Sequence, residues 1–166
     1  TATMSLVTTP AIASSLPSTN VTCFGSCNGP AVATVTNNIG LVNYYWTGGP
    51  SPVSSQTLSG ACAGSYTMTA TDQNSCTATS VVNIIQPAAV TASITSSGSV
   101  TCNGGNNGFA VVTPGGGTPA YTYSWSGTAA ASGNSTNANN LLAGVYTVTV
   151  SDQYSCTAIT NVTILE

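Results

Sequence analysis

The same order of distinctive residues occurs twice along this chain of 166 residues. The corresponding segments are residues 21–23 and 100–102, Trp46 and Trp125, residues 64–69 and 144–149, and residues 71–76 and 151–156. Their spacing is 79 residues as far as the tryptophans and 80 residues after them, which indicates one inserted residue. Self-similarity at a fixed period indicates two copies of one structural unit. We therefore expect residues 11–86 and 87–166 to form two similar domains.

The cysteines follow the repeat, and this suggests how they pair. Repeats of about 80 residues are near the lower size limit for a self-sufficient core, and disulfides commonly stabilise such small domains. Each repeat has one early and one late cysteine, whereas Cys27 and Cys62 have no counterpart in the second repeat. The three expected bridges are Cys23–Cys76, Cys102–Cys156 and Cys27–Cys62.

The alternative to these disulfides is a metal site, because the spacing of Cys23 and Cys27 loosely resembles that of zinc ligands. The second repeat keeps only one cysteine of that pair, and the chain has no histidine. We therefore expect neither a metal nor any other cofactor. Disulfides also predict an oxidising, extracytoplasmic location.

Hydrophobic residues alternate with hydroxyl residues, and no helical stripe of useful length occurs. Tyr146, Val148 and Val150 alternate with Thr and Ser, and residues 66–71 repeat this pattern. One apolar and one polar face is typical of a half-buried antiparallel strand. Further strands are expected at residues 31–36, 42–46, 55–58, 76–85, 90–95, 108–113, 121–125, 136–142 and 156–165. Many short strands separated by Gly, Pro and Asn clusters predict an all-β fold of two tandem β-sandwiches.

Two local motifs support a sandwich. The run from Leu142 to Tyr146 is typical of a tyrosine corner, in which the Tyr hydroxyl bonds back to upstream backbone, and residues 58–66 form a longer version. The strands that follow end at Asp72 and Asp152, whose carboxylates can accept backbone N–H bonds in a tight turn.

The charge composition excludes several classes of function. The chain has no Lys, Arg or His, and only three acidic residues. Binding to nucleic acid or to an anionic membrane surface by basic groups is therefore excluded. The usual general bases near neutral pH are absent, so the many Ser and Thr hydroxyls lack a group to activate them, and we expect no enzyme. No apolar run is long enough to insert across a membrane.

The second repeat resembles the SprB-type repeat. The segments that carry this resemblance are Val100-Thr101-Cys102-Asn103-Gly104-Gly105-Asn106-Asn107-Gly108, residues 116–125, residues 143–152 and Cys156-Thr157-Ala158. In the first repeat, Cys27 and Pro30 interrupt the Asn/Gly run and the middle diverges. Such repeats occur in long cell-surface adhesins of gliding bacteria and are related to PKD and Ig-like sandwiches. The resemblance therefore implies an Ig-like fold and a surface, array-forming, non-catalytic role, without identifying a ligand.

The first ten residues resemble the last strand of the first repeat, residues 77–87. One interpretation is chance similarity in an Ala/Thr-rich sequence, or a cut through a longer array. The other is a strand that pairs with a neighbouring subunit, since strand addition supplies main-chain hydrogen bonds without charge. On this interpretation the assembly strand contains Thr3, Met4, Ser5, Leu6 and Val7.

The aromatic and acidic residues each allow two interpretations. Trp46 and Trp125 are either sugar-stacking platforms or core residues. Each falls on the same face of its expected strand as the inward-facing Tyr residues, which favours a place in the core. Tyr45 and Tyr154 are the better surface candidates. Asp72 and Asp152 could bind calcium, but one carboxylate per turn is a poor site for an ion that takes several oxygens, so turn capping is favoured.

Three asparagines match the N-glycosylation pattern, although a sequence so rich in Asn, Ser and Thr produces matches by chance. They are Asn20, Asn134 and Asn161. Rows of exposed Thr also offer sites for hydroxyl-linked glycans, so we expect covalent glycans of some kind.

These observations favour a structural subunit, or a repeat segment, of an extracellular bacterial filament or surface adhesin. Its partner is itself, as a homopolymer or longer array, because an uncharged hydroxyl surface lacks the repulsion that keeps monomers apart. The alternative is an adhesive module for carbohydrate or another surface, with exposed aromatic residues as the contact.

Overall fold

The computed structural model describes residues 13–127 and 134–166, and all regular structure in them is β-strand. The chain divides into two compact units at Gln86 and Pro87. Unit 1 contains residues 1–21 and 25–86, and unit 2 contains Thr22–Phe24 together with residues 87–166. Thr22–Phe24, which the repeat assigns to the first copy, thus group with unit 2.

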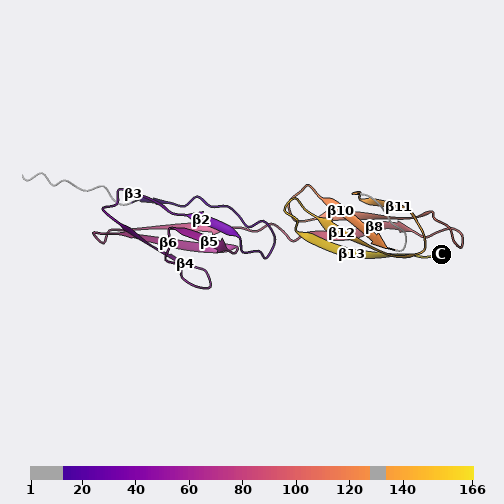
Figure 1. The fold of residues 1–166 in the computed structure, drawn as a ribbon, viewed down its shortest axis with the longest axis horizontal. Coiled ribbons are helices and arrows are strands. Elements are labelled where there is room, and N and C mark those ends of the chain that lie inside the picture. The colour runs from indigo at the N-terminus through magenta and orange to yellow at the C-terminus, as the bar shows by residue number, and fades with distance from the viewer. Residues whose placement is uncertain (1–12, 128–133) are drawn as a thin grey trace, which may run out of the picture. The chain divides into compact units, whose positions relative to one another are not determined.

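Unit 2 is a sandwich of two three-stranded antiparallel sheets (Figure 1). One sheet has the order β10 (Thr122–Gly127), β12 (Gly144–Ser151), β13 (Thr157–Ile164). The other has the order β11 (Asn137–Leu141), β9 (Gly108–Gly115), β8 (Thr91–Gly98). The core lies between them, because its buried side chains come from both sheets, for example Val148 of β12 and Val112 of β9.

Unit 1 repeats this arrangement with one layer broken into pieces. Its continuous sheet has the order β4 (Val42–Thr47), β6 (Gly64–Asp72), β7 (Thr77–Ile84). The other layer contains the pairs β2 (Gly29–Val32) with β5 (Thr57–Ala61), and β1 (Ala13–Ser15) with β3 (Thr34–Thr36). By the repeat, β2 and β3 together correspond to β9. They are separated at buried Ala33, whose N–H bonds to the Gln56 carbonyl at 2.9 Å.

The alternation of apolar and hydroxyl residues explains these strands. In β12, Tyr146, Val148 and Val150 are fully buried, whereas Thr147 and Thr149 on the other face are partly exposed. Strand β6 shows the same pattern. The predicted strands are present, except that the predicted strand 31–36 is divided between β2 and β3, and β1 was not predicted. The fold class of two tandem all-β sandwiches is confirmed.

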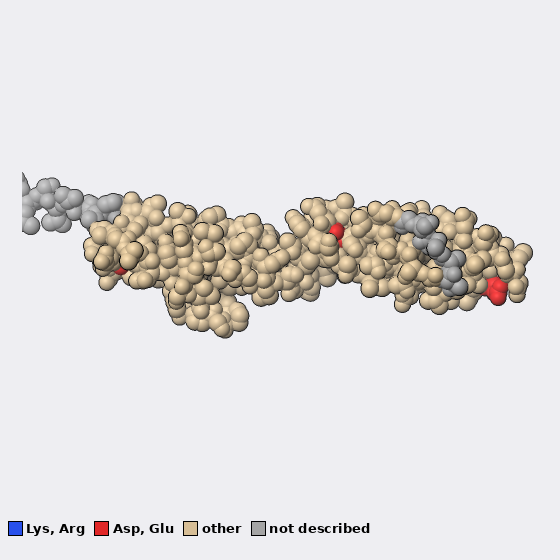
Figure 2. Space-filling model, viewed as in Figure 1, with Lys and Arg blue, Asp and Glu red and all other residues tan. Residues whose placement is uncertain are grey.

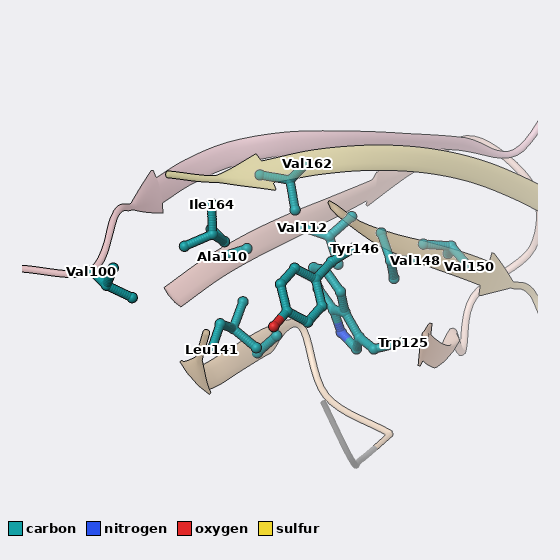
Figure 3. Packing of buried hydrophobic residues seen from close by; sticks show 11 residues of the cluster. Val100, Ala110, Val112, Trp125, Leu141, Tyr146, Val148, Val150, Val162 and Ile164 are labelled. Atoms are coloured by element: carbon teal, nitrogen blue, oxygen red, sulfur yellow. The ribbon is translucent and has the colours of Figure 1, made fainter. Parts of the chain in front are cut away.

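The core of unit 2 is built around two aromatic rings (Figure 3). Trp125 and Tyr146 point into the space between the sheets, among small and branched apolar side chains such as Ala110, Val148 and Leu141. Unit 1 has the corresponding pair, Trp46 and Tyr66, in its own buried cluster. The same inward positions are therefore used by both repeats.

Two disulfides are present, and only one has the predicted pairing. Cys27 bonds to Cys62 in unit 1, as the sequence predicted. Cys23 bonds to Cys156, with their Cα atoms 5.7 Å apart. The predicted bridges Cys23–Cys76 and Cys102–Cys156 are wrong, and Cys76 and Cys102 are free and exposed.

The topology explains why the within-repeat bridges do not form. In unit 2 the N–H of Val100, two residues before Cys102, bonds to the Leu165 carbonyl just after the end of β13. Cys156, by contrast, directly precedes β13. Eight residues of strand separate these two points by about 25 Å, far beyond the roughly 7 Å that a disulfide allows between Cα atoms. In the first repeat, Val21 bonds beside the end of β7 and Cys76 directly precedes β7, so the same strand length separates Cys23 from Cys76.

Candidate functional site

The turn from Asp72 to Cys76, which we call the late-cysteine turn of unit 1, is built around one carboxylate. Asp72 Oδ1 accepts the N–H groups of Asn74 and Cys76, each at 2.9 Å, and Oδ2 accepts the N–H of Ile39 at 3.0 Å. Ser75 has a φ of 64°, in the left-handed region, and completes the turn. The predicted turn-capping role of Asp72 is confirmed.

The late-cysteine turn of unit 2, from Asp152 to Cys156, has the same structure. Asp152 Oδ1 accepts the N–H groups of Tyr154 and Cys156 at 2.8 and 3.0 Å, and Oδ2 accepts that of Thr118 at 2.8 Å. Ser155 has a φ of 63°. Both carboxylates are thus surrounded by backbone N–H dipoles, which stabilise a negative charge and disfavour a cation beside it.

These contacts lower the pKa of both carboxyl groups. The N–H of Ile39 lowers the pKa of Asp72 more than burial raises it, and the N–H groups of Cys76 and Asn74 lower it further. Burial raises the pKa of Asp152, but three backbone N–H donors, led by that of Thr118, together lower it below its ordinary value.

We predict that this protein loses stability in acid through these two turns. Since the folded state lowers both pKa values below 3.8, the contribution is complete above about pH 5 and is lost as the pH falls through the folded values. Urea unfolding midpoints between about pH 7 and pH 2 measure this. Asp72→Asn/Asp152→Asn should be less stable at neutral pH and nearly insensitive to acid. A variant that kept the full acid dependence would show that other groups cause it.

The two loops that carry the early cysteines also match. The early-cysteine loop of the first repeat is Thr22–Gly25, and that of the second is Thr101–Gly104. Gly25 and Gly104 both have a φ of 74°, and no atom lies within 4 Å of the position of an added Cβ at either. Each loop therefore requires a left-handed glycine for its backbone, not for lack of space.

The tryptophans are core residues, as their phase in the sequence indicates. Trp46 and Trp125 are buried, and their Nε1–H groups donate to the backbone carbonyls of Ser55 and Ser135 at 2.8 and 3.0 Å. Their indole rings therefore offer no surface for sugar stacking.

The predicted tyrosine corners are present in both units. The hydroxyl of Tyr66 donates to the Cys62 carbonyl at 3.0 Å, and that of Tyr146 donates to the Leu142 carbonyl at 3.1 Å. Both rings are buried. The corner therefore links the core to the turn that precedes β6 or β12.

We predict that Tyr146→Phe destabilises unit 2 by about 1 kcal/mol, because it removes one hydrogen bond at a buried site without changing the packing. Tyr154→Phe is the matched control, since the Tyr154 side chain is 48% exposed and its loss should change stability by less than about 0.5 kcal/mol. Urea unfolding of both variants gives the comparison. Equal effects would mean that the corner hydrogen bond adds nothing.

The surface is almost uncharged (Figure 2). The visible face shows no basic group and only isolated acidic ones. Tyr45 and Tyr154 are about half exposed, so both are surface residues as expected. The part of the chain that the structure describes contains no group of three or more His, Cys, Asp or Glu placed to hold a metal ion.

A pocket of about 190 Å³ in unit 1 is lined by small and apolar groups, including Pro50, Val53, Leu58 and the Tyr66 ring. Its polar side chains are Ser51, Ser59 and the corner tyrosine, with no carboxylate beside them. Such a lining provides no acid or base for chemistry at neutral pH.

The glycosylation sites and the assembly strand remain predictions. Asn20, Asn134 and Asn161 are exposed, and each uses its Oδ1 as a hydrogen-bond acceptor, from Ile85 N–H, Tyr123 N–H and the Thr147 hydroxyl respectively. The proposed assembly strand, Thr3 to Val7, lies outside the described residues. Over residues 13–127 and 134–166, no helix has the length and hydropathy needed to cross a bilayer.

The Asp-capped turns, the tyrosine corners and the buried aromatic residues were therefore predictable from the sequence. The Cys23–Cys156 disulfide was not predicted. The pairing was predicted only from the matching positions of the cysteines in the two repeats. Matching positions carry no information on the distance between two cysteines in the fold. A better signal was available in the expected strands, because Cys76 and Cys156 stand at the start of the last expected strand of each repeat, whereas Cys102 follows the first expected strand of the second repeat.

Three solved structures show weak overall similarity to this chain. A structure of Dscam matches with a TM-score of 0.37 and 12% identity, covering 89% of this chain and 42% of that one. Murine CEACAM1b matches at 0.33 and 12%, covering 93% and 98%. Tp47, the 47-kilodalton lipoprotein of Treponema pallidum, matches at 0.29 and 13%, covering 96% and 52%. This chain thus spans less than two thirds of the Dscam and Tp47 chains.

A search of curated proteins found no match. The family model of the SprB repeat matches residues 91–130. This segment runs from the start of β8 past the end of β10, so it covers the first half of unit 2 and is narrower than the resemblance seen in the sequence. The predicted resemblance to the SprB-type repeat is confirmed for residues 91–130 of unit 2.

Proposed function

We propose that this chain is a non-enzymatic building unit of an extracellular bacterial filament or surface adhesin, joined to further copies of itself by strand and end-to-end contacts. The observation that carries the proposal is the tandem duplication of one sandwich, of which the second copy matches a SprB repeat. Repeats of this kind are typically adhesive or structural. A single enzyme site would not require two equivalent copies of the same scaffold.

The surface chemistry supports association of the chain with itself. Over a third of the residues are Thr, Ser or Asn, and the net charge is only −3. Little electrostatic repulsion therefore opposes contact between copies. Val81 of β7 and Ile159 of β13 are exposed apolar residues on strands at the edge of their sheets. Exposed edges with apolar side chains favour pairing with another chain.

The absence of basic groups supports a non-enzymatic role. The sequence contains no His or Lys, and the two aspartates of the turns are occupied as backbone acceptors. The remaining acid is Glu166, which accepts the N–H of Gly104 at 3.3 Å. General acid–base catalysis would require a carboxyl group in a substrate pocket, which none of these three residues supplies.

Electron microscopy of the purified full chain, incubated at rising concentration, tests the filament. We expect a regular fibre with two densities per axial repeat, one for each unit. A chain that stays monomeric in sedimentation at the highest soluble concentration contradicts the proposal.

Residues 1–9 are proposed to add as a strand to a sheet edge of the neighbouring copy. Leu6→Pro removes a backbone N–H and prevents continuous pairing, whereas Leu6→Ala keeps the donor and serves as control. We expect only the proline variant to stop fibre growth. Hydrogen exchange at residues 1–9 should also be slower in the fibre than in the isolated chain. Equal and fast exchange in both states would exclude this contact.

A second function, binding of carbohydrate, is favoured by the exposed Tyr45 and Tyr154 rings. Exposed aromatic rings suit stacking against sugars. A glycan array probed with the full chain decides between the two. A specific signal that is abolished by Tyr45→Ala or Tyr154→Ala would support binding, and no signal would leave the structural role alone. Intact mass of native material, compared with the bare polypeptide, tests for glycans on the chain itself.

A further inference from the structure

Two exposed cysteines remain after the disulfides are formed. Cys76 and Cys102 are bonded to no other cysteine, although the described residues include all six cysteines of the chain. By the repeat, Cys102 is the counterpart of Cys23, and Cys76 is the counterpart of Cys156. Cys23 and Cys156 are bonded to each other. The unpaired cysteines are therefore the counterparts of a pair that does bond.

The early-cysteine loop around Cys102 is held in the same way as the loop that bonds. In each repeat the valine two residues before the cysteine donates its N–H to a carbonyl after the last strand, and the glycine two residues after the cysteine donates to a side-chain oxygen. For the first repeat these bonds are Val21 to Ile85 at 3.2 Å and Gly25 to Gln86 at 2.8 Å. For the second they are Val100 to Leu165 at 2.9 Å and Gly104 to Glu166 at 3.3 Å.

The late-cysteine turn around Cys76 likewise matches the turn that bonds. Both turns close with a bond from the aspartate N–H to the cysteine carbonyl, at 3.0 Å in each case, and both have a serine in the left-handed region. The aspartate Oδ1 accepts the N–H of the cysteine in both turns. Cys76 is thus presented by the same backbone as Cys156, but it is exposed and unbonded.

We infer that Cys102 of one copy of this chain forms a disulfide with Cys76 of the next copy. The inference rests on the proposed assembly from copies of the chain and specifies its partner and its bond. In the observed bridge, an early-cysteine loop of one repeat bonds to the late-cysteine turn of the repeat that follows it. The unpaired cysteines offer the same combination: Cys102 lies in the early-cysteine loop of the second repeat of one copy, and Cys76 lies in the late-cysteine turn of the first repeat of the next copy.

The placement of the cysteines within a unit requires the partner to be another molecule or another repeat. In either repeat, the early and late cysteines are separated by a full last strand, so neither can bond within its own repeat. Because one lies at each end, every unit can bond to a preceding and to a following repeat. A heterologous contact of this kind extends into a fibre when its rotation does not close a ring.

The bond forms by oxidation of two thiols. Two S–H bonds break and one S–S bond forms, and the two electrons and two protons pass to a small-molecule disulfide, which is reduced to two thiols. Oxidised glutathione is such an acceptor. The exposure of both thiols allows this exchange.

One contact differs between the observed bridge and the inferred one. Phe24, beside Cys23, lines a shallow pocket of unit 2 together with Ala89 and Val90. Its counterpart beside Cys102 is Asn103. Because the Phe24 side chain is itself 59% exposed, this difference in buried apolar surface is small.

The experiment uses the full chain, exposed to oxidised glutathione and run on denaturing gels without reductant. We expect a ladder of multimers that reductant removes, and a Cys76–Cys102 peptide in digests. Chymotrypsin or pepsin is needed, since trypsin has no Lys or Arg to cleave after. A mixture of Cys76→Ser and Cys102→Ser chains should stop at the dimer, because each has one half of the bond. Tyr154→Phe leaves every cysteine in place, so it should keep the ladder and is the control.

The outcomes separate this inference from the proposed function. Fibres without a ladder contradict the inferred disulfide but agree with the proposed filament. A ladder without fibres supports the disulfide and overturns the filament, and loss of both overturns both. Peptides that join Cys76 to Cys76 or Cys102 to Cys102, or a monomer with a Cys76–Cys102 bond inside one chain, overturn the inference. Mixing isotope-labelled and unlabelled chains identifies bonds between molecules.

Discussion

Trp46→Ala is expected to unfold unit 1 or bring it close to unfolding. The Trp46 side chain is 1% exposed, and its Nε1–H satisfies the Ser55 carbonyl. Truncation of a buried tryptophan costs about 3–5 kcal/mol through lost burial and the cavity left behind. Total stabilities are about 5–15 kcal/mol, and a unit of this size is near the lower end. The apparent melting temperature should fall by roughly 15–25 °C.

Tyr45→Ala is the matched control, since Tyr45 is the neighbouring residue on β4 and points to the other face with 47% exposure. Its effect should be less than about 0.5 kcal/mol. Calorimetry measures both variants, and hydrogen exchange shows whether the loss of protection is confined to unit 1. Equal losses for the two variants would show that β4 does not bury Trp46 while leaving Tyr45 at the surface.

Removal of the Cys23–Cys156 bridge is expected to be the second large effect. In the chain-entropy model, which is disputed, a bridge across 133 residues contributes about 5 kcal/mol and one across 35 residues about 4 kcal/mol. If unit 1 stays folded while unit 2 unfolds, the effective loop is shorter and the contribution falls to about 4 kcal/mol. Cys23→Ser/Cys156→Ser should therefore destabilise unit 2 strongly, as measured by urea unfolding.

The control for this variant is Cys76→Ser/Cys102→Ser, which changes the equivalent positions of the other repeat. Both of these cysteines are exposed and unbonded, so the change in an isolated chain should be less than about 0.5 kcal/mol. If the control lost as much stability as the first variant, the within-repeat pairing predicted from the sequence would be correct after all.

The predictions that succeeded concern features encoded locally. The alternation in Tyr146, Val148 and Val150 is set by the strand period of two, so the buried face can be identified from neighbouring residues alone. The same holds for Asp152, whose carboxylate caps N–H groups two and four residues later. The tyrosine corner is equally local, because Tyr146 bonds to a carbonyl four residues upstream.

The prediction of the disulfide pairing was wrong because pairing depends on the path of the chain between two cysteines. Strands β6 and β7 are antiparallel neighbours that pair Thr71 with Thr77 at one end and Gly64 with Ile84 at the other. The carbonyl of Ile85, just after β7, accepts the N–H of Val21, so the early cysteine lies near that second end. The late cysteine lies in the turn at the first end, and equivalence between repeats gave no sign of this separation.

By itself, the sequence determined the duplication, the strands, the residues of the core and the nearly uncharged surface, because composition and short periods express these directly. Only the tertiary structure decided which cysteines meet, since a bond between residues 23 and 156 depends on the path of every strand between them. That path brings the early cysteine of one repeat to the late cysteine of the next. It thereby leaves one unpaired thiol in each unit, where the sequence had suggested two closed modules.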